Sequence, residues 1–208
     1  MKKIVIVGGG GHCKSVLDSL LELNEYQEIT VTDMDKKPGD KIMGVTVAGD
    51  DSKLKALFEN GYDYAFLAFA SIDSPKLRRK LYNTIKEIGF KIPNIIDKTA
   101  VVSRFSKLGE GVFVGKNAVI NAEAQIGDMT IVNTKALIEH ECIVGSFSHI
   151  SVGAVLCGQA VVGNDAFVGA NATVIQGIRV GNSSIIGAGS VITRDVDENC
   201  KVINKKYE

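Results

Sequence analysis

The chain has 208 residues, enough for one large or two small domains. Lys plus Arg and Asp plus Glu both number 24, so no broad electrostatic field favours binding to nucleic acid or to an anionic membrane. Apolar residues make up 45% and charged residues 23%, which is typical of a folded globular protein and argues against disorder. The longest apolar runs, such as residues 64–70, are far shorter than the roughly 18 residues of a membrane-spanning helix, so we expect no membrane insertion.

The N-terminus and the cysteines favour a cytoplasmic protein. Met1–Lys3 lead directly into an apolar run and then four glycines, without the cleavage site of a signal peptide. The four cysteines form no CxxC pair, and a chain of this length needs no disulfide framework. They are Cys13, Cys142, Cys157 and Cys200. We therefore expect reduced thiols.

The first 93 residues alternate short apolar strands with amphipathic helices. The pattern predicts strands over residues 3–7, 28–32 and 64–70, and helices over residues 15–23, after Ser52, and over residues 76–88. Strands that alternate with helices form a parallel sheet with helical crossovers. Residues 1–93 are therefore expected to form a Rossmann-like α/β domain.

From Ile96 the apolar period changes to six residues. Every sixth residue from Ile96 to Ile192 is Val, Leu or Ile, and glycine directly follows many of them. The residue four places after each of these aliphatic residues is Ala, Ser, Thr, Cys, Val or Ile. This period predicts a parallel β-helix of hexapeptides over residues 94–208, with both positions pointing inward and glycines at corners of left-handed backbone. The pattern resembles the left-handed β-helix of the hexapeptide acyltransferases.

Two histidines occupy outward positions of this register. They are His140 and His149, and the β-helix contains no other histidine. Outward positions disfavour a role in the core, although a solvated surface histidine remains an alternative for each of them taken alone. A three-histidine zinc site is not expected, because the third histidine, His12, lies in the other domain.

The residues around His140 suit acyl transfer. Glu139 and Glu141 flank this histidine, and an adjacent carboxylate can hold an imidazole in one tautomer as a general base near neutral pH. Transfer from a thioester to an amine or hydroxyl also needs a hydrogen-bond donor for the developing oxyanion. A backbone N–H at Gly158 or at a nearby turn is a candidate.

The segment 133–154 carries a more specific resemblance. It contains Asn133-Thr134, Ile-Glu-His140-Glu141-Cys and Phe-Ser-His149-x-Ser-x-Gly-Ala, and it resembles the PglD/NeuD family of sugar acetyltransferases. The resemblance covers nearly the whole chain, since that family also begins with a small Rossmann-like domain. It implies that His140 is the general base, that Glu141 orients it, and that Asn133 and His149 lie near the acetyl donor. Asn133 can alternatively replace glycine in left-handed backbone at a corner.

The same resemblance implies the location of the second substrate. It places acetyl-CoA between neighbouring subunits of a homotrimer. The matching positions are small residues beside which a pantetheine arm can lie, and an arginine that can reach a CoA phosphate: Gly158, Ala170, Ala188 and Arg194. A solvated charge at the end of the β-helix is the alternative for Arg194.

Four glycines and a histidine, residues 8–12, stand between the first strand and the first helix. Backbone N–H groups and a helix N-terminus can receive phosphate oxygens there, and Asp33 ends the next strand, where a carboxylate commonly meets ribose hydroxyls. The dinucleotide fingerprint is incomplete, because Cys13 or Lys14 replaces its third glycine. The family resemblance implies that the loop holds a nucleotide-sugar acceptor, and a tight turn without a ligand is the alternative. The implied residues are Gly10, Gly11, His12, Asp33 and Asp35.

Two segments depart from the family pattern. Residues 68–73 read Ala-Phe-Ala-Ser-Ile-Asp, with Phe69 where the family has a Gly-Asn or Gly-Asp pair near the acceptor. Residues 202–208 lack the Gly-x-Pro-Ala-Lys with which the family tends to end, near the adenine of CoA. These departures bear on the identity of the acceptor and on the CoA contacts.

The sequence therefore predicts an acetyl-CoA-dependent N-acetyltransferase that acts on a nucleotide-linked amino sugar as a homotrimer. Two alternatives stay open: a sugar O-acetyltransferase of the sialic acid type, and a non-catalytic trimeric scaffold that binds a nucleotide.

Overall fold

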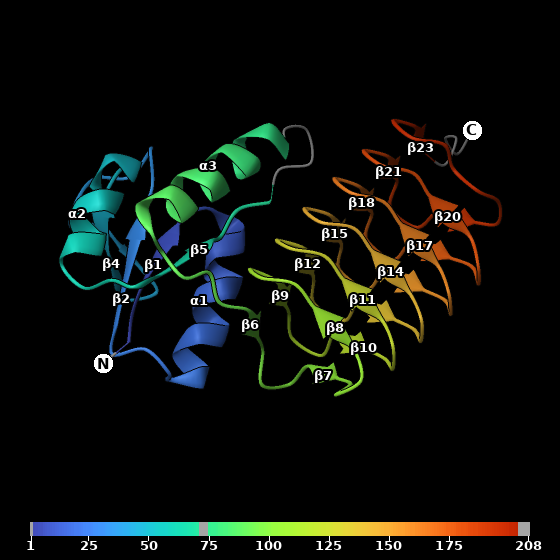
Figure 1. Cartoon of the computed structure of the whole chain (residues 1–208), viewed down its shortest axis with the longest axis horizontal. Coiled ribbons are helices and arrows are strands. Elements are labelled where there is room, and N and C mark those ends of the chain that lie inside the picture. The colour runs from blue at the N-terminus through green and yellow to red at the C-terminus, as the bar shows by residue number, and fades with distance from the viewer. Residues whose placement is uncertain (1, 71–74, 204–208) are drawn as a thin grey trace. The chain divides into compact units, whose positions relative to one another are not determined.

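The computed structural model describes residues 2–70 and 75–203 (Figure 1). The chain divides into two compact units, Met1–Ile95 and Ile96–Glu208. The first unit contains helices and a mixed sheet, and the second consists of short stacked strands. The predicted fold class, a Rossmann-like α/β domain followed by a left-handed β-helix, is confirmed.

The first unit is a five-stranded sheet with the order β3-β4-β2-β1-β5. All neighbouring strands are parallel except β3 and β4, which pair antiparallel. The interior strand β1 is apolar on both faces and buried from Ile4 to Val7, as expected for a parallel strand covered by helices. The elements are β1 (Lys3–Val7), α1 (Gly11–Leu23), β2 (Glu28–Thr32), β3 (Lys41–Ile42), β4 (Val45–Gly49), a 3-10 turn (Asp51–Lys53), α2 (Leu54–Glu59), β5 (Tyr64–Leu67) and α3 (Pro75–Ile88).

Some details of this unit differ from the prediction. Helix α1 begins at Gly11 and not at residue 15, because the buried Cys13 already belongs to its apolar face. The hairpin β3–β4 was not predicted. Its two turn residues, Met43 and Gly44, both have positive φ, and a Met-Gly pair is not a usual signal for such a turn. Strand β5 ends at Leu67 and not at Ala70.

The second unit consists of three sheets built from two-residue strands, which form the three faces of the coil (Figure 1). Paired residues up to β22 are 18 positions apart, as in Leu137 opposite Val155, so each of these coils contains three hexapeptides, whereas Ile185 and Lys201 in the last coil are 16 positions apart. The first face contains β7 (Val101–Val102), β10 (Val119–Ile120), β13 (Leu137–Ile138), β16 (Val155–Leu156), β19 (Thr173–Val174) and β22 (Val191–Ile192). The second face contains β8 (Lys107–Leu108), β11 (Gln125–Ile126), β14 (Ile143–Val144), β17 (Val161–Val162) and β20 (Arg179–Val180). The third face contains β6 (Ile95–Ile96), β9 (Phe113–Val114), β12 (Ile131–Val132), β15 (His149–Ile150), β18 (Phe167–Val168), β21 (Ile185–Ile186) and β23 (Lys201–Val202).

The interior of the coil contains the two predicted inward positions. The second residue of each central strand is an aliphatic side chain without exposure, as at Ile120, Ile138 and Leu156, and small residues such as Ala136 and Ala154 fill the space between them. We call the turns from the first to the second face the first corner, and those from the third to the first face the third corner. Residues 139–142 and 133–136 are examples of these two corners.

The backbone at the corners corrects one prediction. The left-handed position lies three residues after the inward aliphatic residue, and it is often not glycine, as at Glu123 (φ 61°) and Glu141 (φ 58°). The glycines that directly follow the aliphatic residues are not left-handed. Glycine is needed there because a Cβ would meet the next coil, at 2.5 Å from the Asn164 backbone N in the case of Gly145.

Across the described ranges, no helix combines the length and the apolar character that crossing a membrane requires.

Candidate active site

The predicted base and its carboxylate partner lie together in the turn between β13 and β14. Nδ1 of His140 is 3.1 Å from Oε2 of Glu141, and Gln159 on the next coil donates to the same oxygen at 3.2 Å. About half of each side chain of the pair is exposed, 52% for His140 and 47% for Glu141. A proton on Nδ1 that is donated to the carboxylate leaves Nε2 as the acceptor, which is the state a general base needs.

The imidazole of His140 lies against the next coil of the helix. A Cβ added to Gly158, 18 residues later, would be 2.7 Å from both Cε1 and Nε2 of His140. Gly158 is not left-handed, so its backbone conformation does not require glycine. The absence of a side chain at Gly158 therefore makes room for the imidazole, a role that the sequence analysis did not predict.

Asn133 and His149 form a second pair, between the third face and the third corner. Nδ2 of Asn133 is 3.2 Å from Nε2 of His149, and Oδ1 of Asn133 accepts the Thr134 N–H at 2.8 Å. The His149 ring packs edge-on against Phe167 at 5.2 Å between centroids. Asn133 is not left-handed, so the alternative that it replaces glycine for its backbone conformation is wrong. Its side chain instead fixes His149 in place.

The two pairs do not meet within one chain. The His140–Glu141 pair lies at the first corner, and the Asn133–His149 pair lies at the other end of the first face. The outward residues of the first face between them are almost all branched aliphatics. They are Val101, Val119, Leu137, Val155, Thr173 and Val191. The two terminal valines, Val101 and Val191, are 62% and 63% exposed.

The other residues predicted to contact CoA follow on later coils. Ala170 and Ala188 lie at the third corner and are half-buried and exposed, respectively, whereas Arg194 is exposed at the first corner. Arg194 and Lys201 line a surface groove of about 680 Å³ at the C-terminal end of the coil. Lys201 was missed because it lies beyond the last regular hexapeptide. Residues 204–208, which belong to the segment that lacks the family motif, lie outside the described residues.

Asp33 connects the loops that follow the first two strands. Its Oδ2 accepts the Gly9 N–H at 2.6 Å, and its Oδ1 accepts the Asp35 N–H at 3.1 Å. Gly10 has extended backbone and Gly11 begins α1; a Cβ added to either would meet nothing within 4 Å. A tight turn alone therefore does not explain these two glycines, and the space beside them is open to a ligand.

Gly8 and Gly9, in contrast, are required by packing. Gly8 has φ +98°, and a Cβ there would be 2.9 Å from Cδ1 of Phe69. At Gly9 a Cβ would be 2.9 Å from the Asp33 carboxylate. Phe69, the departure from the family pattern, thus packs over the first glycine of the loop. Residues 71–73 of the same segment lie outside the described residues.

His12 lies in the first turn of α1. Burial, and then the positive charge of the buried Arg78, lower the pKa of His12 to about 4. The ring is therefore neutral near pH 7, so at the predicted acceptor site it can contribute hydrogen bonds and not a charge.

The two buried cysteines, Cys13 and Cys142, are poor nucleophiles. The Cys142 thiol donates to the Cys157 carbonyl at 3.1 Å, and burial raises its pKa to about 11. Burial, followed by the charge of Asp33, raises the pKa of Cys13 to about 12. Both thiols stay protonated near neutral pH, which argues against an acyl-enzyme on either. The described part of the chain contains no cluster of three His, Cys, Asp or Glu side chains that could hold a metal ion.

Comparisons with known proteins identify the family of the chain. Residues 3–85 match the model of the PglD N-terminal domain, and residues 159–194 match that of the hexapeptide repeat of succinyl-transferase. A histidine-to-alanine mutant of GDP-perosamine N-acetyltransferase from Caulobacter crescentus, in complex with CoA and GDP-perosamine, is 39% identical. The match covers 97% of this chain and 93% of that one, with a TM-score of 0.90. The chain belongs to the PglD-type family of sugar acetyltransferases.

Two further structures extend the comparison with this family. The acetyltransferase domain of PglB from Neisseria gonorrhoeae, in complex with acetyl coenzyme A, is 32% identical over 96% of this chain and 95% of that one, with a TM-score of 0.89. WeeI from Acinetobacter baumannii is 18% identical over 98% of both chains with a TM-score of 0.75, which shows a shared fold. No curated protein sequence matches significantly.

These findings confirm the predicted family and enzyme class, an acetyl-CoA-dependent sugar acetyltransferase. The structure places the predicted residues in two pairs and one glycine loop, and their roles stay predictions. The structure adds three features to those predicted from the sequence. Gly158 lies against the imidazole, Gln159 donates to Glu141, and Lys201 lines the same groove as Arg194. The first two lie one coil, or 18 residues, after the residues they contact, and that spacing is readable in the sequence.

Proposed function

We propose that this chain transfers the acetyl group of acetyl-CoA to the amino group of a nucleotide-linked amino sugar, with His140 as the general base. The observation that carries the proposal is the His140–Glu141 pair at 3.1 Å with its imidazole against Gly158. Transfer to nitrogen and not to a hydroxyl is supported by the relative at 39% identity, a GDP-perosamine N-acetyltransferase. Acetyl-CoA and nucleotide sugars are cytoplasmic metabolites, so we place the enzyme in the cytoplasm.

The chemistry assigned to His140 is one proton transfer in each direction. Nε2 accepts a proton from the acceptor amine as its nitrogen attacks the thioester carbonyl, and the imidazolium then returns this proton to the leaving thiolate. Glu141 stabilises the imidazolium and keeps Nδ1 protonated. The amine reacts as the free base, so one proton passes to solvent for each ammonium consumed.

We assign to the backbone N–H of Gly158 the role of binding the oxyanion. Its N–H donates no hydrogen bond to another described residue, and the residue lies directly beside Nε2 of His140. A backbone N–H in this place can stabilise the charge that develops on the carbonyl oxygen.

We propose that the enzyme is a homotrimer and that each site uses two chains. The two pairs lie at opposite ends of the apolar first face, so neither completes a site within its own chain. If three chains pack their first faces around a threefold axis, the first corner of one chain approaches the third corner of the next. This arrangement buries the exposed valines Val101 and Val191. It also brings His140 of one chain near Asn133 and His149 of the next.

Subunit complementation tests this arrangement. Chains carrying His140→Ala and chains carrying His149→Ala are expected to be nearly inactive alone. After refolding together at equal amounts, random trimers should regain about a quarter of the wild-type rate, because one site in four pairs an intact His140 with an intact His149. A mixture that stays inactive, or a monomeric enzyme that is active, would show that the site lies within one chain.

The overall function is tested by thiol release from acetyl-CoA with UDP-, GDP- and dTDP-linked 4-amino sugars. We expect turnover with at least one of them and a product that gains one acetyl group by mass spectrometry. An amide product resists hydroxylamine, whereas an ester, the product of an O-acetyltransferase, does not. Nucleotide binding without turnover on any sugar would favour the scaffold alternative.

A further inference from the structure

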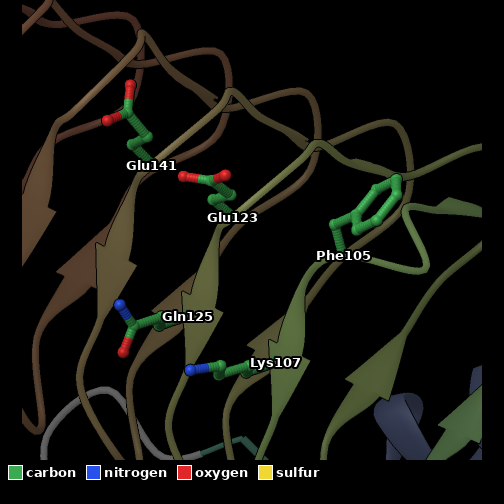
Figure 2. A pocket seen from close by; sticks show the side chains of 5 residues that line it. All are labelled: Phe105, Lys107, Glu123, Gln125 and Glu141. Atoms are coloured by element: carbon green, nitrogen blue, oxygen red, sulfur yellow. The ribbon is translucent and has the colours of Figure 1, made fainter.

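A groove of about 500 Å³ opens at the first corner, on the N-terminal side of the His140–Glu141 pair. It is lined by Phe105, Lys107, Glu123, Gln125 and Glu141, and Figure 2 shows these side chains on successive coils. Its volume is within the usual range for a small-molecule site, roughly 300–1,000 Å³. None of the roles assigned above explains the first four residues.

Glu123 occupies the same position as Glu141, one coil earlier. Both are left-handed, with φ 61° and 58°, so their side chains leave the corner in the same way, about 4.8 Å apart along the coil. The Glu141 carboxylate is engaged by His140 and Gln159. The Glu123 carboxylate has no hydrogen bond or ion pair with any described residue, and in Figure 2 it extends towards the Glu141 coil.

The rest of the groove combines complementary groups. Lys107 and Gln125 are paired neighbours on the second face, and neither side chain bonds to a described residue. Phe105 is 62% exposed, and the Arg104 guanidinium lies 4.8 Å from its ring centroid. A carboxylate and an amide can bind sugar hydroxyls, an ammonium can bind a phosphate, and an aromatic ring can contact the C–H face of a pyranose.

We infer that this groove holds the hexose ring of the acceptor, between its amine at His140 and its anomeric phosphate at Lys107. Glu123 and Gln125 then bind the ring hydroxyls, and Phe105 contacts the ring. This inference rests on the proposed function.

The length of the groove and its position on the N-terminal side of His140 support this assignment. Two coil steps, from Glu141 to Phe105, span about 10 Å, which matches a pyranose with its first phosphate. The residues assigned to CoA, from Gly158 to Arg194, lie on later coils, so the N-terminal side of His140 is left for the acceptor.

Glu123→Ala tests the inference in the full-length enzyme. We expect the KM for the nucleotide-linked amino sugar to rise about tenfold with kcat changed less than about threefold, because a binding contact is lost. Glu123→Gln, which can still bond hydroxyls, should recover most of the loss. Affinity for CoA, measured by calorimetry, should stay unchanged. Lys107→Ala should also raise this KM, with a smaller effect at high salt.

Asp165→Ala is the matched control, since Asp165 is also left-handed (φ 57°) and lies at a different corner. It should leave KM unchanged. Unchanged KM in Glu123→Ala, a fall in kcat alone, or weaker CoA binding would each overturn the inference. A wild-type enzyme that acetylates no amino sugar would instead overturn the proposed function, so the two failures are distinguishable.

Discussion

Replacing His140 with alanine is expected to lower kcat by about 10³-fold, within the range by which a positioned general base accelerates proton transfer. Nε2 of this residue is the base that the geometry assigns to the acceptor amine, and the buried Cys142 thiol, whose pKa is raised to about 11, cannot replace it. The measurement is steady-state thiol release with the amino sugar identified by the screen.

The His140→Ala enzyme should still bind both of its substrates. A histidine-to-alanine mutant of the Caulobacter crescentus relative was solved with both CoA and GDP-perosamine bound. In this chain the alanine leaves a space above Gly158, so added imidazole should restore part of the rate. If His140→Ala keeps a wild-type kcat, His140 is not the base.

Gly158→Ala is expected to lower kcat about 10²-fold. The new Cβ would lie 2.7 Å from Cε1 and Nε2 of His140, so the ring must shift, and a displacement of about 1 Å at a reacting group can cost a factor of this size. The protein should still fold, because the three atoms nearest to the Cβ all belong to the movable His140 side chain and Gly158 does not need positive φ. We therefore expect kcat to fall while the melting temperature stays nearly unchanged.

A double variant sharpens this test. If Gly158→Ala acts through the imidazole, the His140→Ala/Gly158→Ala enzyme should be no slower than His140→Ala alone. Gly145→Ala is a useful contrast, since its Cβ would be 2.5 Å from the Asn164 backbone and should reduce stability. A full additional loss in the double variant would show that the Cβ at position 158 acts independently of the His140 side chain.

The β-helix was predictable because one physical requirement repeats. Every coil needs inward aliphatic and small residues, so the pattern is present in each hexapeptide, and the strands fall where it predicts. The corner conformation was not predictable from glycine alone. The left-handed positions hold Glu, Lys, Met and Phe as well, whereas the glycines respond to close approach of the next coil.

The site was predictable where its residues are neighbours in sequence, as with His140 and Glu141. Contacts between coils, such as that of His140 with Gly158, were not predictable from the six-residue period, because it does not show which residues 18 positions apart touch. That Asn133 and His149 lie apart from His140 within one chain could also be seen only from the three-dimensional arrangement of the strands. In the first unit, the β3–β4 hairpin has too few residues to show a period.

The 18-residue coil also determines which changes of length this enzyme can tolerate. Arg194 lies at the same corner as His140, three coils later, about 14 Å along the axis. Insertion of one hexapeptide between them would keep the core pattern but move Arg194 to another edge of the prism. Only an insertion of a whole coil preserves the alignment, and it lengthens the separation by about 4.8 Å. The distance between the reacting end and the far end of the donor can thus change only in discrete steps.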